Sequence, residues 1–196
     1  MAPVAENRKG RPAATSHGEI ERAAFRLFAE RGFEGTTLDD VAEAVGVGRR
    51  TLFRYYRSKN DIPWGQFHET LEHFAAVLRQ SPRETSLLEA VHRGVVVFNT
   101  FPADVTADHR RRMRLILETP ELQAYSALQY TAWRTVISTY IAERLDVPES
   151  SPLPQVVGHV SLGLALSAYE AWLADDDSDL VGLLDDCLVA LRTYVQ

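Results

Sequence analysis

The residues with the clearest chemical potential form a basic stretch between Val45 and Lys59. Five of its fifteen residues are arginine or lysine, and none is acidic. Arginine binds phosphate oxygens and can donate two hydrogen bonds to guanine O6 and N7, so this composition is typical of nucleic-acid contact. A basic helical face is also common on solvated protein surfaces, and that alternative stays open for the stretch taken alone.

The spacing inside this stretch predicts a short helix over residues 49–56. At ~100° per residue, Leu52 and Tyr56 fall within ~40° of each other, and Arg54 points away from both. So narrow an apolar stripe cannot hold a two-turn helix in place, because short helices depend on packing against a neighbour. An upstream element must therefore support it.

The upstream support is an amphipathic helix whose apolar residues recur at i, i+3, i+4 and i+7 from Leu38 to Val45. Thr37 stands at its N-cap position with Asp40 three residues further on, and Gly46 stands where it must end. A helix, a glycine-containing turn and a basic helix together predict a helix-turn-helix, with the basic helix as the recognition helix.

Helical periodicity continues through the rest of the chain. Ser16 and Glu19 have capping-box spacing before a helix that ends near Gly32, and a long helix is expected from Ser58 to Ser81. Further helices are expected near residues 86–100, 104–118, 121–146, 153–175 and 178–195.

The sequence therefore predicts an all-α protein of about nine helices, with an N-terminal three-helix DNA-binding head and a larger helical body. The expected domains are a flexible basic arm over residues 1–15, a helix-turn-helix domain over 16–58, and an effector-binding and dimerisation domain over 59–196. Arg8, Lys9 and Arg11 in the arm suit either a solubilising tail or an arm that reaches a minor groove or phosphates of DNA.

Charge is distributed unevenly along the chain. The formal net charge is −6, but residues 1–59 carry a net +3 and residues 60–196 a net −9. Phosphate attraction is thus expected to be local to the N-terminal part.

The lone Cys187, next to several leucines, suits a buried thiol in a reducing compartment. No signal peptide or uninterrupted apolar run of membrane-spanning length is evident, so a cytoplasmic protein without membrane contact is expected.

The last two expected helices are unusually apolar on all sides. A helix of this kind must be covered on every face, and one small body does not easily cover two of them. A symmetric homodimer through residues of about 153–195 would cover both. A monomer with these helices as its central core is the alternative.

Sequence patterns for enzymatic chemistry are weak. His68 and His73 are five residues apart and so diverge by about 140° on a helix, unlike the i, i+4 pair of a zinc protease. No phosphate-binding loop or nucleophile elbow is present. We expect no catalytic residues, no metal site, no cofactor and no enzyme activity.

The N-terminal pattern resembles a known family. The motifs that carry the resemblance, over roughly residues 16–62, are Ala29-Glu30-Arg31-Gly32-Phe33-Glu34-Gly35-Thr36-Thr37-Leu38-Asp39-Asp40-Val41-Ala42 and Gly46-Val47-Gly48-Arg49-Arg50-Thr51-Leu52-Phe53-Arg54-Tyr55-Tyr56-Arg57-Ser58-Lys59. They are similar to the DNA-binding head of TetR-family transcriptional regulators. The run from Ser58 to Gly65 and the Gly10-Arg11-Pro12 segment look like the regulators associated with mycofactocin biosynthesis.

This resemblance implies a homodimer that binds double-stranded, pseudo-palindromic operator DNA and releases it when a small hydrophobic effector enters the body. Repression is the family's commonest mode. The DNA-binding residues implied are Thr37, Gly48, Arg49, Arg50, Thr51, Arg54, Tyr55 and Lys59. Phe53 departs from the family pattern, because a tyrosine often stands there and contacts phosphate. An alternative is a helical ligand-binding or protein-interaction module without specific DNA binding, or, less readily, a small-molecule enzyme.

The resemblance also implies an apolar effector cavity in the body. The expected lining residues are Phe67, Phe74, Phe98, Phe101, Arg112, Tyr130, Trp133 and Tyr169, although aromatic residues at helical spacing are also ordinary core. The arginine cluster over residues 110–114 suits either a solvated face paired with carboxylates or the phosphates of an acyl-CoA effector.

Overall fold

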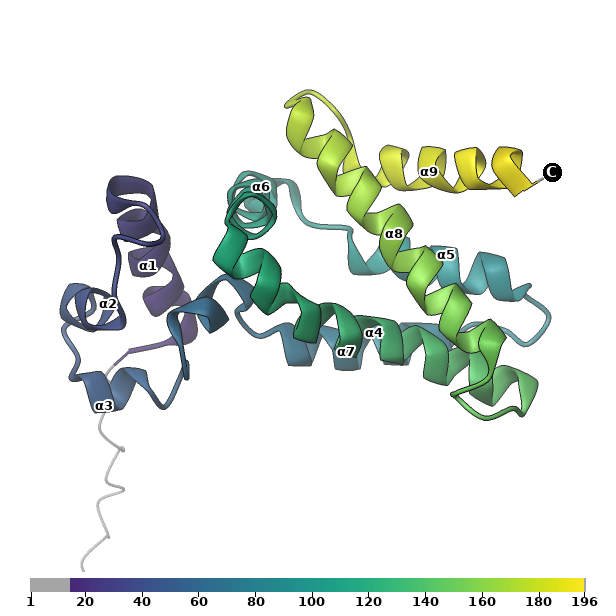
Figure 1. The fold of residues 1–196 in the computed structure, drawn as a ribbon, viewed down its shortest axis with the longest axis horizontal. Coiled ribbons are helices and arrows are strands. Elements are labelled where there is room, and N and C mark those ends of the chain that lie inside the picture. Colours follow the sequence, from purple (N-terminus) through teal and green to yellow (C-terminus); the bar gives the residue numbers. More distant parts are fainter. Residues whose placement is uncertain (1–14, 196) are drawn as a thin grey trace, which may run out of the picture. The chain divides into compact units, whose positions relative to one another are not determined.

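The computed structural model describes residues 15–195, and the arginines and lysine expected to form a basic arm lie outside this range. The described chain is helical, without a strand (Figure 1). It divides into two compact units, an N-terminal head that ends at Gly65 and a body that begins at Gln66. The expected boundary lay earlier, after residue 58.

The head contains three α-helices, α1 (His17–Arg31), α2 (Leu38–Ala44) and α3 (Arg49–Leu52). The capping boxes predicted at Ser16 and Thr37 are both formed, because each side chain accepts a hydrogen bond from the third helical residue and that residue's carboxylate accepts one in return. At the end of α2, Gly46 has φ of +69°, a left-handed conformation that glycine adopts without a steric penalty.

The recognition helix is shorter than the sequence indicates. α3 spans four residues, and the chain then continues as a turn to Tyr56, whose amide donates to the Leu52 carbonyl. Leu52 and Tyr56 are both buried, as their shared face predicts. The other buried apolar side chains of the head core include Ile20, Leu27 and Phe28 of α1, Phe33 of the turn after it, and Val41 of α2.

The prediction of one long helix from Ser58 to Ser81 is wrong. The chain forms a 3-10 helix, η1 (Lys59–Trp64), breaks at Gly65, and resumes as α4 (Phe67–Arg79). Ser58 stands at the N-cap position of η1, and the Asp61 carboxylate accepts hydrogen bonds from the main-chain amides of Arg57 and Ser58, which closes a tight turn. Gly65 then takes φ of +53° and ψ of −132°, which ends the segment.

The body contains the remaining helices, at positions close to those expected. They are α5 (Leu87–Phe98), α6 (Ala103–Glu118), α7 (Pro120–Leu145), α8 (Pro152–Ala174) and α9 (Leu180–Val195). α7 lies along α4, and α8 crosses α7 and packs on α9 (Figure 1). The core lies between these helices and includes Phe74, Leu78, Ile116, Trp133, Ile137 and Trp172.

α8 has apolar residues on both its buried and its exposed sides. Leu153, Val156 and Val160 remain 51%, 55% and 38% exposed, while Trp172 on the opposite side is buried. Among the helices of residues 15–195, α8 is the one long and apolar enough to cross a membrane. The core helix of a soluble protein has the same length and composition, so these properties alone assign no membrane role.

Candidate nucleic-acid interface and ligand-binding body

Gly48 is the N-cap of the recognition helix α3, and an exposed ion pair connects this helix to α2. Arg49 lies 2.9 Å from the Asp39 carboxylate, and its guanidinium carbon lies 5.3 Å from the centre of the Phe53 ring. Both charged side chains are exposed, so the pair contributes little stability. It does orient Arg49, and a DNA phosphate would compete with Asp39 for this side chain.

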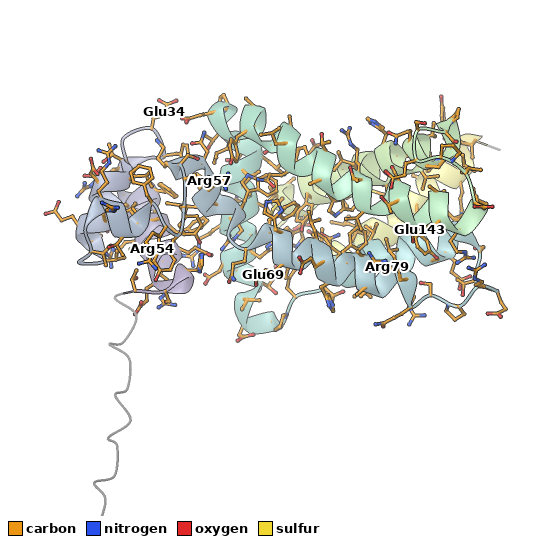
Figure 2. The ribbon with its side chains drawn as sticks, turned by 90° about the horizontal axis from the view of Figure 1, so that it is seen from below. Glu34, Arg54, Arg57, Glu69, Arg79 and Glu143 are labelled. Carbon is orange, nitrogen blue, oxygen red and sulfur yellow. The ribbon has the colours of Figure 1, made fainter. Side chains whose placement is uncertain are left out.

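Arg50, on α3, and Arg54, in the turn that follows α3, are two expected DNA-binding arginines. Both are exposed, and neither forms an ion pair with any residue between 15 and 195. Thr51, between them, is half-buried. Figure 2 shows Arg54 and Arg57 on the head. A side chain without an internal partner can bind a base edge or a phosphate without first breaking a contact.

Thr37 is engaged in its own helix cap. Its hydroxyl donates to the Asp40 carboxylate over 2.6 Å, and its main-chain amide donates to the same oxygen over 2.8 Å. The hydrogen bonds from Thr37 hold the pKa of Asp40 below its usual range. Donation from Thr37 to a phosphate would therefore require Asp40 to move.

Tyr55 and Lys59 are bonded inside the head. The Tyr55 hydroxyl donates to the carbonyl of Thr15 over 2.7 Å, and its ring meets His17 edge-on. The Lys59 ammonium donates to the Phe33 carbonyl over 2.7 Å, and it lies 4.2 Å from the centre of the Phe33 ring. Their expected phosphate contacts remain predictions, since each would add to these bonds or replace them.

Four of the expected effector-binding aromatics form one packed cluster in the body. Phe74 stacks on Trp133 with ring centres 5.5 Å apart, and Phe98 meets Phe74, Trp133 and Phe67 at 5.1, 6.2 and 6.3 Å. Phe74 and Trp133 are buried, while Phe67 and Phe98 are half-buried. In this structure these rings contact one another, which is the core alternative that the sequence left open.

Phe101 and Tyr169 belong to a second, polar cluster. The Tyr169 hydroxyl donates to Asn99 Oδ1 over 2.8 Å and lies 2.8 Å from His109 Nε2. The Phe101 and His109 rings are tilted by 30° to each other, with their centres 3.8 Å apart. Burial, followed by the charge of Arg112, lowers the pKa of His109 to about 4. Burial also raises the pKa of Tyr169, so both side chains are neutral near pH 7.

The arginine cluster of α6 is largely occupied by partners within the body. Arg110 donates to the carbonyls of Trp172 and Asp175 at the C-terminal end of α8, where positive charge is favourable. Arg114 lies 3.6 Å from Asp176 and donates to the Leu173 carbonyl. Arg111 pairs with Asp108. These contacts match the paired-surface alternative, and phosphates would have to displace them.

The described part of the body has hollows on its surface, and two of them are relevant here. One, of about 400 Å³, is lined by Leu117, Glu118, Gln123, Tyr130, Leu166, Glu170, Leu173 and Ala174. The other, of about 150 Å³, lies between α4 and α7 and includes Arg79 and Glu143, which Figure 2 labels. Tyr130 is the one expected effector-binding residue that lines either of these hollows. Sequence reasoning did not identify Glu170 or Asn99, because a single exposed glutamate or helix-ending asparagine carries no motif.

These features define a class of protein, a helix-turn-helix DNA-binding protein with a separate helical body. Residues 20–62 match the family model of bacterial regulatory proteins of the tetR family, and residues 85–196 match the model of the MftR C-terminal domain. The chain belongs to the TetR family of bacterial transcriptional regulators.

Two relatives are similar over most of the chain. A protein of Mycobacterium tuberculosis, named mycofactocin biosynthesis transcriptional regulator MftR, is 45% identical over 91% of this chain and 90% of its own. The HTH-type transcriptional regulator TcmR of Streptomyces glaucescens is 28% identical over 84% of this chain and 76% of its own. The relatives are transcriptional regulators, not enzymes.

A solved structure shares the fold. The TetR-family repressor FadR of Thermus thermophilus, in complex with lauroyl-CoA, superimposes with a TM-score of 0.58 at 23% identity, covering 90% of this chain and 93% of its own.

Proposed function

We propose that this protein is a cytoplasmic, ligand-controlled repressor that binds a pseudo-palindromic operator as a homodimer and releases it when a small hydrophobic molecule binds the body. The observation that carries the proposal is the pair of exposed, unpaired arginines, Arg50 on α3 and Arg54 in the turn after it, on a segment fixed by the buried Leu52. Such a helix fits the major groove, where arginine can read guanine.

The dimer is proposed to form through α8 and α9. Leu153, Val156, Val160, Gly163 and Ser167 follow one another at steps of three and four residues and are all exposed. α9 adds exposed Val189. Small and apolar residues at this spacing allow helices of two copies to pack closely. A two-fold axis would then present two recognition helices to two operator half-sites.

Long-chain acyl-CoA is the effector class proposed for the body. Support comes from the fold shared with the lauroyl-CoA complex of FadR and from the apolar aromatic cluster around Phe98. The CoA phosphates would have to exchange with Asp108, Asp176 or main-chain carbonyls for the arginines of α6.

The test is fluorescence anisotropy of the purified protein on labelled DNA from the upstream regions of its own and neighbouring genes. For specific binding, the logarithm of the association constant should fall linearly with the logarithm of the salt concentration, because each neutralised phosphate releases counterions. Lauroyl-CoA and oleoyl-CoA should release the DNA, whereas free CoA should not.

Each outcome of this experiment has a separate meaning. Specific binding that no acyl-CoA reverses would retain the regulator and reject the effector class. Binding that is equal on operator and unrelated DNA would contradict sequence-specific regulation. A lack of binding on any of these DNAs would favour an interaction module.

A further inference from the structure

The larger hollow of the body is built from the facing parts of three helices. Leu117 and Glu118 come from the end of α6, Gln123 and Tyr130 from the first half of α7, and the remaining residues from the second half of α8. Its volume of about 400 Å³ lies within the range of ~300–1,000 Å³ typical of small-molecule sites.

The walls of this hollow are apolar. Leu166 and Leu173 lie within ~20° of each other on α8 at ~100° per residue, and both are half-buried. Leu117, also half-buried, faces them from α6, and Ala174 leaves room at the end of α8. A ligand with a short hydrocarbon portion would cover these side chains and remove them from water.

The charges of the lining are negative. Glu118 and Glu170 line the hollow, and no arginine or lysine does. Glu170 forms no ion pair with any residue in the described part of the chain. The nearby cation Arg114 is shared among Glu118 at 3.9 Å, Asp176 at 3.6 Å and the Leu173 carbonyl. The lining therefore disfavours an anion such as a carboxylate or a CoA phosphate.

Tyr130 adds an aromatic ring to the same wall. Burial raises the pKa of its phenol, and the Glu170 carboxylate contributes in the same direction, so the ring stays neutral and electron-rich near pH 7. The face of a neutral phenol attracts a cation, and the attraction grows when water is excluded. Together, a carboxylate and a phenol beside an apolar wall complement an ammonium group attached to hydrocarbon.

The geometry points to a binding site for a small organic cation, an amine with an apolar chain or ring, in the hollow between α6, α7 and α8. The ammonium group is held by Glu170 and the Tyr130 ring, and the hydrocarbon portion lies against Leu117, Leu166 and Leu173. The hollow does not include the rings of the aromatic cluster around Phe98, and the assignment does not depend on DNA binding.

Isothermal titration calorimetry of the full chain with three eight-carbon probes tests this assignment. At pH 7, n-octylamine carries a positive charge, 1-octanol is neutral and octanoate is negative. We expect n-octylamine to bind at least ~10-fold more tightly than 1-octanol, because ~1.4 kcal/mol of charge attraction corresponds to a factor of ten. Octanoate should give no measurable binding.

Variants locate the site. Glu170→Gln keeps the side-chain size on an exposed position and should weaken n-octylamine binding ~10-fold while leaving 1-octanol unchanged. Glu143→Gln removes an equally exposed carboxylate in the smaller hollow and should leave n-octylamine binding unchanged. Equal affinity for the three probes, tighter binding of octanoate, or an unaltered Glu170→Gln variant would overturn the proposal.

Discussion

His109 is a half-buried histidine whose hydrogen bond to Tyr169 selects one neutral tautomer. Tyr169 uses its single proton to donate to Asn99 Oδ1, so its oxygen accepts from His109 Nε2–H. The neutral tautomer with a proton on Nε2 satisfies this chain. A protonated His109 would place a half-buried positive charge near Arg112. The cluster is thus stable only with a neutral ring.

This cluster predicts a loss of stability in mild acid. The pKa of His109 is about 4 in the folded protein, below the value of about 6.5 for an unfolded histidine. The unfolded state therefore binds more protons between these values, and stability present above pH 6.5 declines as the pH falls towards 4. The decline attributable to His109 should be on the order of 2–3 kcal/mol.

The measurement is urea unfolding, followed by tryptophan fluorescence, at pH values from 7 to 4. His109→Gln, which cannot become charged, should show a shallower decline than the natural protein. His73→Gln changes an exposed histidine of α4 and serves as the control. Parallel pH curves for His109→Gln and the natural protein would contradict a half-buried neutral His109.

Arg54 should influence which DNA sequence is bound. If its guanidinium reads a guanine, Arg54→Ala should weaken operator binding by about 1–3 kcal/mol and weaken unrelated DNA much less. Arg50→Ala is expected to behave in the same way. Arg57→Ala, an exposed arginine beyond the recognition helix, serves for comparison and should affect all sequences alike. Equal losses on operator and unrelated DNA for Arg54→Ala would assign it to phosphate.

At the residue scale, the sequence predicted which side chains could bind DNA, but it did not predict which residues they contact in the structure. The basic stretch identified Arg50, Arg54, Tyr55 and Lys59 as DNA-binding candidates. The bond from Tyr55 to the Thr15 carbonyl joins residues 40 positions apart, and that from Lys59 to the Phe33 carbonyl joins residues 26 apart. Such contacts depend on how the helices pack, and periodicity carries no information about them.

At the scale of elements, a glycine lets α7 and α8 approach each other closely. A methyl group at Gly158 of α8 would lie 2.8 Å from Ser138 Oγ and 3.1 Å from the Arg134 carbonyl oxygen, both on α7. Gly158→Ala should therefore destabilise the body by about 1–3 kcal/mol, since overpacking forces neighbouring atoms to shift. Gly18→Ala, where the added methyl meets only ordinary contacts, should change stability by about 0.5 kcal/mol or less.

Urea unfolding followed by circular dichroism measures both variants. A Gly158→Ala protein as stable as the natural one would show that α7 and α8 separate at little cost, and the crossing would then not be fixed by this residue.

Local signals predicted most helix ends, and one failure is informative. The capping boxes at Ser16 and Thr37 depend only on residues three positions apart, so the sequence contains all of their determinants. The stripe from Trp64 to Leu78 continues across Gly65, and apolar spacing alone therefore predicted one helix. The break arises because Asp61 closes a tight turn and Gly65 adopts φ of +53°.

At the scale of the whole molecule, the sequence indicated which helices have more apolar surface than one body can bury. It did not indicate which faces of those helices stay exposed. The apolar composition of α8 and α9 predicted an interface over residues of about 153–195. The structure shows that α8 packs on α5, α6, α7 and α9, and that Ala165, Ala168 and Trp172 on one side of it are buried. The opposite side, with Val156 and Val160, remains for a second copy.

Dimerisation through that side predicts a monomeric variant. Val156→Asp combined with Val160→Asp places four carboxylates across a two-fold interface, where their repulsion and loss of hydration oppose association. Light scattering after size exclusion should give about twice 22.0 kDa for the natural protein and 22.0 kDa for the double variant.

The double variant should also lose operator affinity by at least ~100-fold, because a single recognition helix makes only half of the contacts. The control is Val105→Asp, which changes a valine of α6 that is 40% exposed, and this variant should remain dimeric. A double variant that keeps its helical circular dichroism and stays dimeric would show that α8 does not form the interface.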